Sequence, residues 1–292
     1  MSKTGQTITL YMIDGEPTGR IKSYISAKNG IVYKIPRKMF DSCKTGDGDI
    51  VRHLKQTGIY FLVGENDEGK QTIYVGQAEV RKNGEALSQR ITEHIKNEKE
   101  KYWNDWNEIL VFTTTDNSLH STRISYLENK FRNLAIECKR YVVLNGNEPN
   151  KGNIPEEDEC VMQSYIDDVR MLIGILGYKV FEPLVDTEDI GFDMNKYEFI
   201  FQGKYQAKAL YTNEGFVLLK NSELNPKINQ SSGYATKKAR EKYKEIIVNN
   251  KTTENILFTS PSAAANFVSG SSSSGNVFWK TSNGKFPKDI EL

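Results

Sequence analysis

The chain has 292 residues, with 39 basic and 38 acidic side chains, so its formal net charge at pH 7 is only +1. This balance does not by itself indicate nucleic acid as a partner. Cys43, Cys138 and Cys160 are far apart, which argues against a zinc site or a disulfide framework. No apolar run is long enough to span a membrane and no signal-peptide core opens the chain, so we expect a cytoplasmic protein.

The first segment, from Thr7 to Phe40, alternates short apolar runs with turn residues. The dipeptide Asn29-Gly30 precedes a strand-like run and is typical of a hairpin turn. We therefore expect residues 1–53 to form a small β module of three to four strands. Its role stays open between an extension that contacts DNA and a lid packed on the next domain.

A second hairpin is predicted where two strand-like runs flank a polar stretch. The first run opens with Gly58-Ile59-Tyr60, and the second closes with Tyr74-Val75-Gly76. If the turn is centred near Asp67, the two tyrosines lie directly opposite each other and point to the same face. Taken alone, such a pair is more often packing than chemistry, because tyrosine is a favoured strand residue.

Residues 85–101 carry a helical pattern in which an apolar residue recurs at every fourth position. Arg90 and His94 form the adjacent row and therefore stack on one face. A third strand is expected over 109–115. The alternatives are that His94 is a half-buried packing residue and that Arg90 is an exposed helix former.

A second helix is expected over 121–140, with Leu127, Phe131 and Leu134 as its apolar stripe. Glu128 lies at the polar margin of this stripe. The alternative for Glu128 is a surface ion pair with Arg132, four residues further along the helix.

These residues, taken in order, resemble the GIY-YIG endonuclease family over about 54–147. The resemblance is carried by Gly58-Ile59-Tyr60, Tyr74-Val75-Gly76-Gln77, Arg90 with His94, and Tyr126-Leu127-Glu128. It implies a small three-stranded antiparallel sheet flanked by helices, and metal-assisted cleavage of a phosphodiester. The stretch between Gly76 and Arg90 is longer than in compact members, so either Arg81 or Arg90 is the family's arginine. We prefer Arg90, because it stands four residues before a histidine.

The resemblance also implies a role for each residue of the predicted catalytic set. Tyr60 is expected to act as general base, helped by His94, because an unperturbed phenol with a pKa near ~10 is a poor base at neutral pH. Tyr74 is expected to orient the phosphate or the water, and Arg90 to bind the scissile phosphate through its fork of donors. Glu128 is expected to hold one Mg²⁺ or Mn²⁺ ion.

Positive charge gathers on and around the first predicted helix, although glutamates are interspersed there. Together with this patch, turn and tail residues give a set predicted to contact nucleic acid, DNA more than RNA: Gln77, Arg81, Lys82, Lys96, Asn145, Trp279 and Lys280. Asn145 precedes a glycine and also suits a plain turn. Trp279 is suited either to base stacking or to filling a hydrophobic core.

The remainder of the chain is expected to form a linker with a connecting helix over 151–190 and an α/β module over 191–292. In the module, strands are predicted at 199–202, 204–211, 215–219 and 276–280, with a charged helix at 236–249. A further helix is predicted to start after Ser260 as N-cap, with Pro261 in its first position. This tail resembles the domain of unknown function that often follows GIY-YIG domains in bacterial and phage proteins.

The expected fold class is α+β, with the nuclease domain at 54–150 between the N-terminal β module and the C-terminal α/β module. The predicted function is a divalent-metal-dependent endonuclease acting on DNA, with restriction or phage defence as its setting. The alternative is a catalytically silent nucleic-acid-binding protein that retains the same fold.

Overall fold

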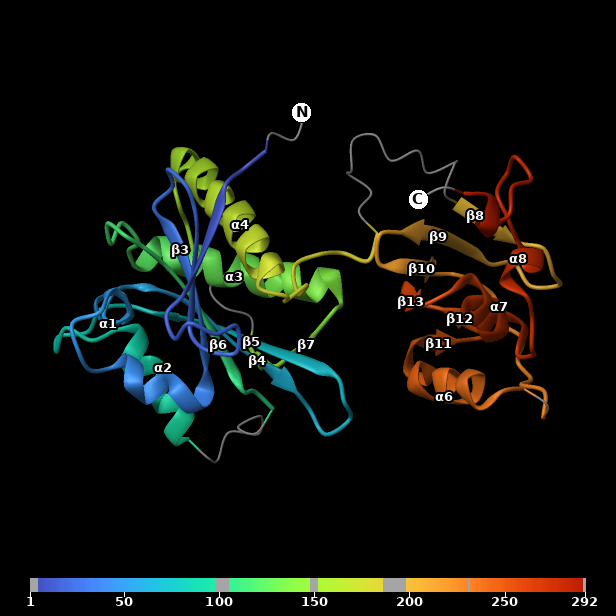
Figure 1. Ribbon diagram of the computed structural model, residues 1–292, viewed down its shortest axis with the longest axis horizontal. Helices are drawn as coiled ribbons and strands as arrows, with labels where there is room; N and C mark the ends of the chain where they lie inside the picture. The colour runs from blue at the N-terminus through green and yellow to red at the C-terminus, as the bar shows by residue number, and fades with distance from the viewer. Residues whose placement is uncertain (1–4, 98–104, 148–151, 186–197, 231, 291–292) are drawn as a thin grey trace. The chain divides into compact units, whose positions relative to one another are not determined.

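The computed structural model describes residues 5–97, 105–147, 152–185, 198–230 and 232–290. The chain divides into two compact units, Met1–Pro183 and Leu184–Leu292. Each unit has its own β-sheet and helices (Figure 1). The predicted α+β class is confirmed, and each unit is described by itself below.

A seven-stranded sheet forms the centre of the first unit. In spatial order its strands are β1 (Ile8–Met12), β2 (Ile21–Ile25), β3 (Gly30–Pro36), β6 (Glu108–Thr114), β4 (Gly58–Glu65), β5 (Gln71–Ala78) and β7 (Val142–Val143). Strand β5 pairs with β7 in parallel, and the other neighbours pair antiparallel.

The N-terminal strands join this sheet, which differs from the expected separate β module and from the expected three-stranded sheet. Strand β3 pairs with β6 along its whole length, from Gly30 opposite Thr114 to Pro36 opposite Glu108. The physical reason is that nearly every residue of β3 is buried. A strand that is apolar on both faces is stable only inside a sheet that is covered on both sides.

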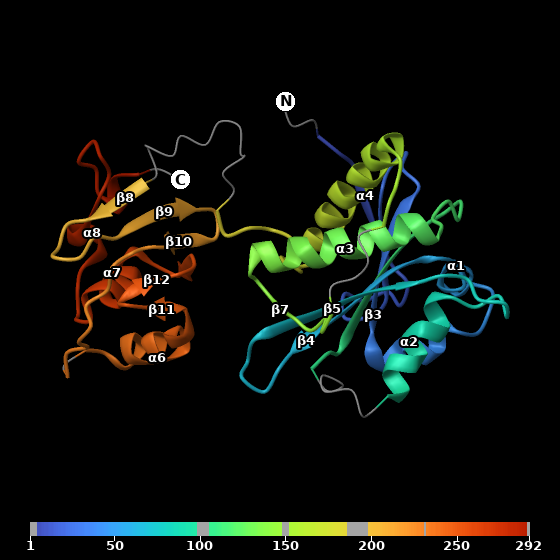
Figure 2. The ribbon, with the colours of Figure 1, turned by 180° about the vertical axis from the view of Figure 1, so that it is seen from behind.

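Helices cover both faces of the first sheet (Figures 1 and 2). One face carries α3 (Ser121–Cys138) and α4 (Glu156–Ile175), and the other carries η1 (Arg37–Cys43), α1 (Asp49–Leu54) and α2 (Leu87–Lys96). Helix α4 falls in the segment expected to hold a linker and a connecting helix, yet it is part of the core of this unit, since Met162 and Val169 are completely buried there. The end of the helix predicted over 85–101 lies outside the described residues.

The alternation of β4 divides its side chains between two cores. Ile59 and Phe61 pack beneath α3 and α4, whereas Tyr60 and Leu62 pack on the side of α2. This period of two is what a strand dictates. It places Tyr60 inside the sheet-to-helix interface that also contains α2.

The β4–β5 hairpin has a register different from the predicted one. Tyr60 lies opposite Gly76, and Tyr74 lies opposite Leu62. The turn is centred on Glu68, because the Asn66 N–H bonds the Lys70 carbonyl at 3.0 Å. A shift of two residues keeps the same face, so the two tyrosine rings still stack diagonally, with centroids 6.2 Å apart.

The second unit contains a five-stranded antiparallel sheet. In spatial order its strands are β13 (Ile256–Phe258), β10 (Gly215–Leu218), β9 (Lys208–Thr212), β8 (Glu198–Phe201) and β14 (Trp279–Lys280). A short ribbon joins β11 (Ile247–Val248) to β12 (Lys251–Thr252). Among the residues of this unit that the structure describes, the helices are α6 (Tyr234–Lys242), η2 (Lys244–Ile246), α7 (Pro261–Ser269), α8 (Gly275–Phe278) and η3 (Pro287–Asp289).

Two predicted elements of the second unit end differently. The charged helix expected up to Asn249 ends at Lys242, and its last predicted residues instead form η2 and the β11–β12 ribbon, whose turn is made by Asn249 and Asn250, both with positive φ. The strand expected over 276–280 is reduced to Trp279–Lys280 after the short helix α8. The predicted cap of α7 is confirmed, since the Ser260 hydroxyl accepts a hydrogen bond from the Ala263 N–H at 3.2 Å.

Within the described residues, the helices are all too short or too polar to serve as membrane spans.

Candidate active site

Tyr60 is the centre of the predicted site and is completely buried. Its hydroxyl lies 2.8 Å from His94 Nε2 and also hydrogen-bonds the Arg90 guanidinium. A guanidinium can only donate, so the phenol oxygen accepts from Arg90 and the phenol proton is left for His94. These two polar contacts join Tyr60, on strand β4 of the sheet, to helix α2.

Glycine at position 76 provides the room that this phenol occupies. A Cβ added to Gly76 would lie 2.3 Å from both the ring carbon Cζ and the hydroxyl oxygen of Tyr60. A Cβ on Gly58 would lie 2.4 Å from the Phe112 carbonyl oxygen of the neighbouring strand. Sterics therefore favour glycine at both positions of the hairpin motif, since a real Cβ does not approach neighbouring atoms so closely.

Helix α2 positions Arg90 and His94. Leu87 and Ile91 anchor the helix on the sheet with no exposed surface, and the adjacent row then faces the tyrosines. His94 is 3 % exposed and its ring centroid lies 5.0 Å from that of Tyr74. The guanidinium-bearing side chain of Arg90 is 40 % exposed, so it connects the buried phenol to the surface.

Glu128 reaches the same region from helix α3, along the outer edge of β5. Its carboxylate accepts a hydrogen bond from the Gln77 backbone N–H. Arg132, considered as its surface partner, donates to Asn133 at 3.2 Å. Burial raises the pKa of Glu128 to about 7, and the Arg90 charge and the Gln77 hydrogen bond only partly offset this.

The electrostatics of Tyr60 follow from the same neighbours. Burial is the main cause that raises its pKa well above 10, and the nearby Tyr74 and Glu128 raise it further, while Arg90 acts in the opposite direction. In this structure the phenol is therefore neutral at pH 7. Arg90 and Glu128 each act on the phenol, so the predicted catalytic residues are brought together.

The two arginines considered for the site have different contacts. Arg90 contacts Tyr60, whereas Arg81 forms an ion pair with Glu93, with Nη2 3.0 Å from Oε2. Glu93 in turn accepts from Arg90 at 3.1 Å. Glu93 is a residue that the sequence reasoning missed, although its position three residues after Arg90 on the helix was a usable signal.

Of the other predicted nucleic-acid contacts, Lys82 and Lys96 are exposed. The Gln77 side chain accepts a hydrogen bond from the Ser125 hydroxyl at 3.2 Å. The Asn145 amide is engaged with β5, since it accepts from the Val75 N–H at 3.0 Å and donates to the Val75 carbonyl at 2.7 Å. That geometry gives Asn145 a structural role at the sheet edge.

The prediction that Trp279 stacks on bases is wrong for this structure. Its side chain is completely buried among aromatic residues of the second unit, and Nε1 donates to the Pro261 carbonyl at 3.0 Å. A satisfied, buried indole fills the core, which was the other reading of its sequence position. Lys280 is partly buried, with Nζ 4.9 Å from the centroid of the Phe286 ring.

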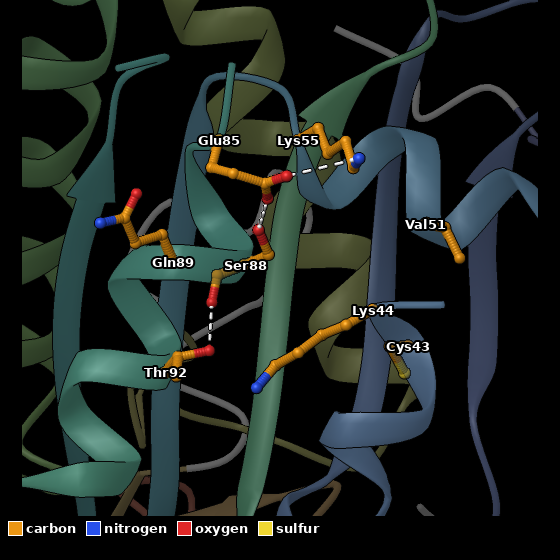
Figure 3. A pocket seen from close by; sticks show the side chains of 8 residues that line it. All are labelled: Cys43, Lys44, Val51, Lys55, Glu85, Ser88, Gln89 and Thr92. Atoms are coloured by element: carbon orange, nitrogen blue, oxygen red, sulfur yellow. Dashed lines mark hydrogen bonds and ion pairs between the residues drawn. The ribbon is translucent and has the colours of Figure 1, made fainter. Parts of the chain in front are cut away.

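A pocket of about 310 Å³ lies beside Arg90, lined by Gln77, Ala78, Glu79, Val80, Arg81 and Arg90. A second pocket of about 300 Å³ lies between α2, α1 and η1 (Figure 3). In the second pocket Lys55 pairs with Glu85 at 3.3 Å, and Thr92 bonds the Ser88 carbonyl at 2.6 Å. Ser88 and Thr92 lie on the helix face opposite Arg90 and His94, so only the first pocket belongs to the site.

Metal ligands are sparse around the site. Within the part of the chain that the structure describes, no three His, Cys, Asp or Glu side chains gather where they could hold one ion. Glu128 is therefore a candidate for a site with one protein carboxylate, in which water and substrate oxygens fill the other positions.

Comparison with known proteins informs the second unit alone. A family model described as a domain of unknown function, DUF4357, matches residues 198–291. This match confirms the predicted resemblance of the C-terminal module to a domain of unknown function. No curated protein and no solved structure matches the chain.

Proposed function

We propose that the first unit is a metal-dependent endonuclease of the GIY-YIG type, which cleaves phosphodiesters in DNA in preference to RNA. The observation that carries the proposal is the buried Tyr60 phenol, held by His94 at 2.8 Å and by Arg90, with Glu128 close enough to affect its pKa. Packing alone does not require a guanidinium, an imidazole and a carboxylate beside one buried phenol.

Arg90 binds the scissile phosphate in this proposal. Its side chain is 40 % exposed, so its remaining donors can reach a phosphate oxygen while one contact holds the phenol. A planar fork of donors suits two phosphate oxygens and offsets the negative charge that builds up in the transition state.

Glu128 is the residue that would hold Mg²⁺ or Mn²⁺. The carboxylate fits this role because it is partly buried with incomplete compensation of its charge, as its raised pKa of about 7 indicates. The bound ion would supply Lewis-acid stabilisation of the phosphate and of the departing oxygen. Gln77 orients the carboxylate through its backbone N–H.

Tyr60 and His94 handle the proton of the attacking water. The neutral phenol passes its own proton to His94 Nε2, 2.8 Å away, and its oxygen then accepts the proton of the water. Tyr74, whose ring stacks on that of Tyr60, orients the phosphate or the water. We propose that this activity serves restriction or phage defence in the cytoplasm.

Nicking of supercoiled plasmid in Mg²⁺ tests the proposal. The parent protein is expected to nick the plasmid, and EDTA is expected to abolish the reaction. Glu128→Gln and Glu128→Ala are expected to lose at least about 100-fold in rate, since catalytic electrostatic groups commonly contribute this much.

Glu108→Gln is the matched control. Glu108 is a carboxylate on β6 whose pKa burial also raises, and its Oε2 lacks a hydrogen-bond partner within the described structure. Removing that charge should leave nicking at the parent's rate. If Glu128→Gln cuts as well as the parent, the metal assignment is wrong. EDTA-insensitive DNA binding without nicking by the parent would instead indicate the catalytically silent alternative.

A further inference from the structure

Two arginines share one carboxylate at the entrance of the candidate site. Arg81, in the connection between β5 and α2, places both of its terminal nitrogens on Glu93, and Arg90 reaches Glu93 Oε2 at 3.1 Å. The three side chains are 41 %, 40 % and 39 % exposed for Arg81, Arg90 and Glu93. The two arginines hold the pKa of Glu93 at about 2, chiefly through the Arg81 hydrogen bonds. Glu93 therefore remains ionised at any working pH.

Both guanidiniums also line the pocket of about 310 Å³. A volume of this size is at the lower end of small-molecule sites and exceeds what a phosphate group needs. Gln77 lines the same pocket while its backbone N–H holds Glu128. The pocket therefore adjoins the position proposed for the scissile phosphate.

We propose that Glu93 stands in for a substrate phosphate: in the free protein it holds Arg81 and Arg90, and on binding Arg81 turns to the phosphate next to the one being cleaved. This inference rests on the proposed function and narrows the substrate class. The substrate is a nucleic-acid chain with at least two consecutive phosphates, and an isolated phosphodiester would not use Arg81.

The exchange is energetically accessible because the ion pairs are exposed. Such exposed pairs contribute little to stability, since water solvates the separated charges nearly as well. Carboxylate and phosphate both match the guanidinium fork, so one can replace the other without new geometry. Glu79 also lines the pocket, and its charge opposes any anion that binds there.

Binding of fluorescein-labelled duplex DNA, followed by fluorescence anisotropy in EDTA at several salt concentrations, tests the inference in the full chain. Glu93→Gln is expected to tighten binding roughly three- to tenfold, because two guanidiniums are released from their internal partner. Glu79→Gln, which removes a carboxylate from the same pocket, is expected to tighten it by less than about twofold through weaker repulsion alone.

Arg81→Ala is expected to weaken binding and to reduce the slope of log K against log salt concentration by about 0.9, the value for one lost phosphate contact. Arg52→Ala is the matched control, since Arg52 is an exposed arginine in an ion pair with Asp49 and lies on α1. Its slope should equal that of the parent. Circular dichroism of each variant verifies that the fold is kept.

The inference is overturned if Glu93→Gln binds no tighter than Glu79→Gln, if Arg81→Ala keeps the parent's salt slope, or if neither parent nor Glu93→Gln binds DNA. Cleavage is absent from this experiment, so its result is separate from that of the nicking assay. A protein that binds as expected but never nicks would retain the phosphate subsite and lose the proposed catalysis.

Discussion

Glu128 is the residue whose ionisation links the site to the stability of the fold. Its pKa in the folded protein is about 7, above the ordinary value of 4.5. Between these values the folded protein holds a proton that the unfolded chain has lost. Stability therefore falls as the pH rises through this window, and the loss persists above it.

Glu128→Gln should remove this loss. For the metal-free protein at about pH 8.5, we expect the free energy of unfolding to rise by at most on the order of 3 kcal/mol, with almost no change near about pH 4. Thermal unfolding at the two pH values measures the effect. Mg²⁺ should stabilise the parent at the higher pH and leave the variant unchanged; equal Mg²⁺ stabilisation of both would argue against Glu128 as the ligand.

Single residues of the site were predictable where a motif fixed their type and spacing. Tyr60, Arg90, His94 and Glu128 come together because strand and helix periods set their faces. Trp279 was ambiguous, because its burial depends on the fold around it. The role of Glu93 between two arginines also depends on the β5–α2 connection, whose path is not set by a repeating pattern.

Strand β5 shows how elements hold the site together. Its outer edge is completed in three steps: β7 pairs with Thr72 and Ile73, the Asn145 amide bonds Val75, and the Glu128 carboxylate bonds the Gln77 N–H. An edge strand needs such partners for its backbone groups. Glu128, the proposed metal ligand, is therefore the last of the successive partners along this edge.

Asn145→Ala should disturb this edge. It leaves the Val75 N–H and carbonyl without their side-chain partner, which we expect to cost about 1–3 kcal/mol of unfolding free energy. Nicking should also fall, because Gln77, whose N–H holds the Glu128 carboxylate, lies two residues beyond Val75 on the same strand. Denaturant unfolding and the plasmid assay measure both effects.

Asn133→Ala is the control, since it removes an amide bonded to Asn129 and Arg132 on α3. This variant should keep the nicking rate of the parent. Equal losses of nicking in the Asn145 and Asn133 variants would contradict the edge role of Asn145.

Element types were largely predictable, whereas register and ends were not. The hairpin slipped by two residues because Asn66 and Lys70 close the turn, a local hydrogen bond that alternation does not encode. The helix predicted to Asn249 could not reach that residue, because Asn249 and Asn250 adopt positive φ in the turn of the β11–β12 ribbon. The pairing of β3 with β6 joins residues more than seventy positions apart, and such long-range pairing is not specified by local patterns.

The whole molecule has two units whose buried clusters are separate. The clusters around β4 and α3 lie within Met1–Pro183, and the cluster around Trp279 lies within Leu184–Leu292. The predicted boundary at residue 53 falls inside the first unit, since composition alone does not reveal that β3 joins the central sheet. Domains with separate cores commonly unfold separately.

Calorimetry should accordingly show two unfolding transitions. Trp279→Ala is expected to destabilise one of them by about 3–5 kcal/mol through the cavity it leaves. Phe131→Ala, at an equally buried position of the first unit, should lower the other transition by a similar amount. One transition that both variants shift equally would show that the two cores unfold together.

The central claim, that the buried Tyr60 phenol takes part in DNA cleavage, is tested most directly by plasmid nicking with two matched tyrosine variants. Tyr33 is also completely buried, and its hydroxyl lies 2.7 Å from His53 Nδ1 in the same core cluster. Tyr60→Phe should lower the rate by at least about 100-fold, as expected for loss of a general base. Tyr33→Phe breaks a comparable buried contact and should nick like the parent; a Tyr60→Phe protein that nicks at the parent's rate would contradict the claim.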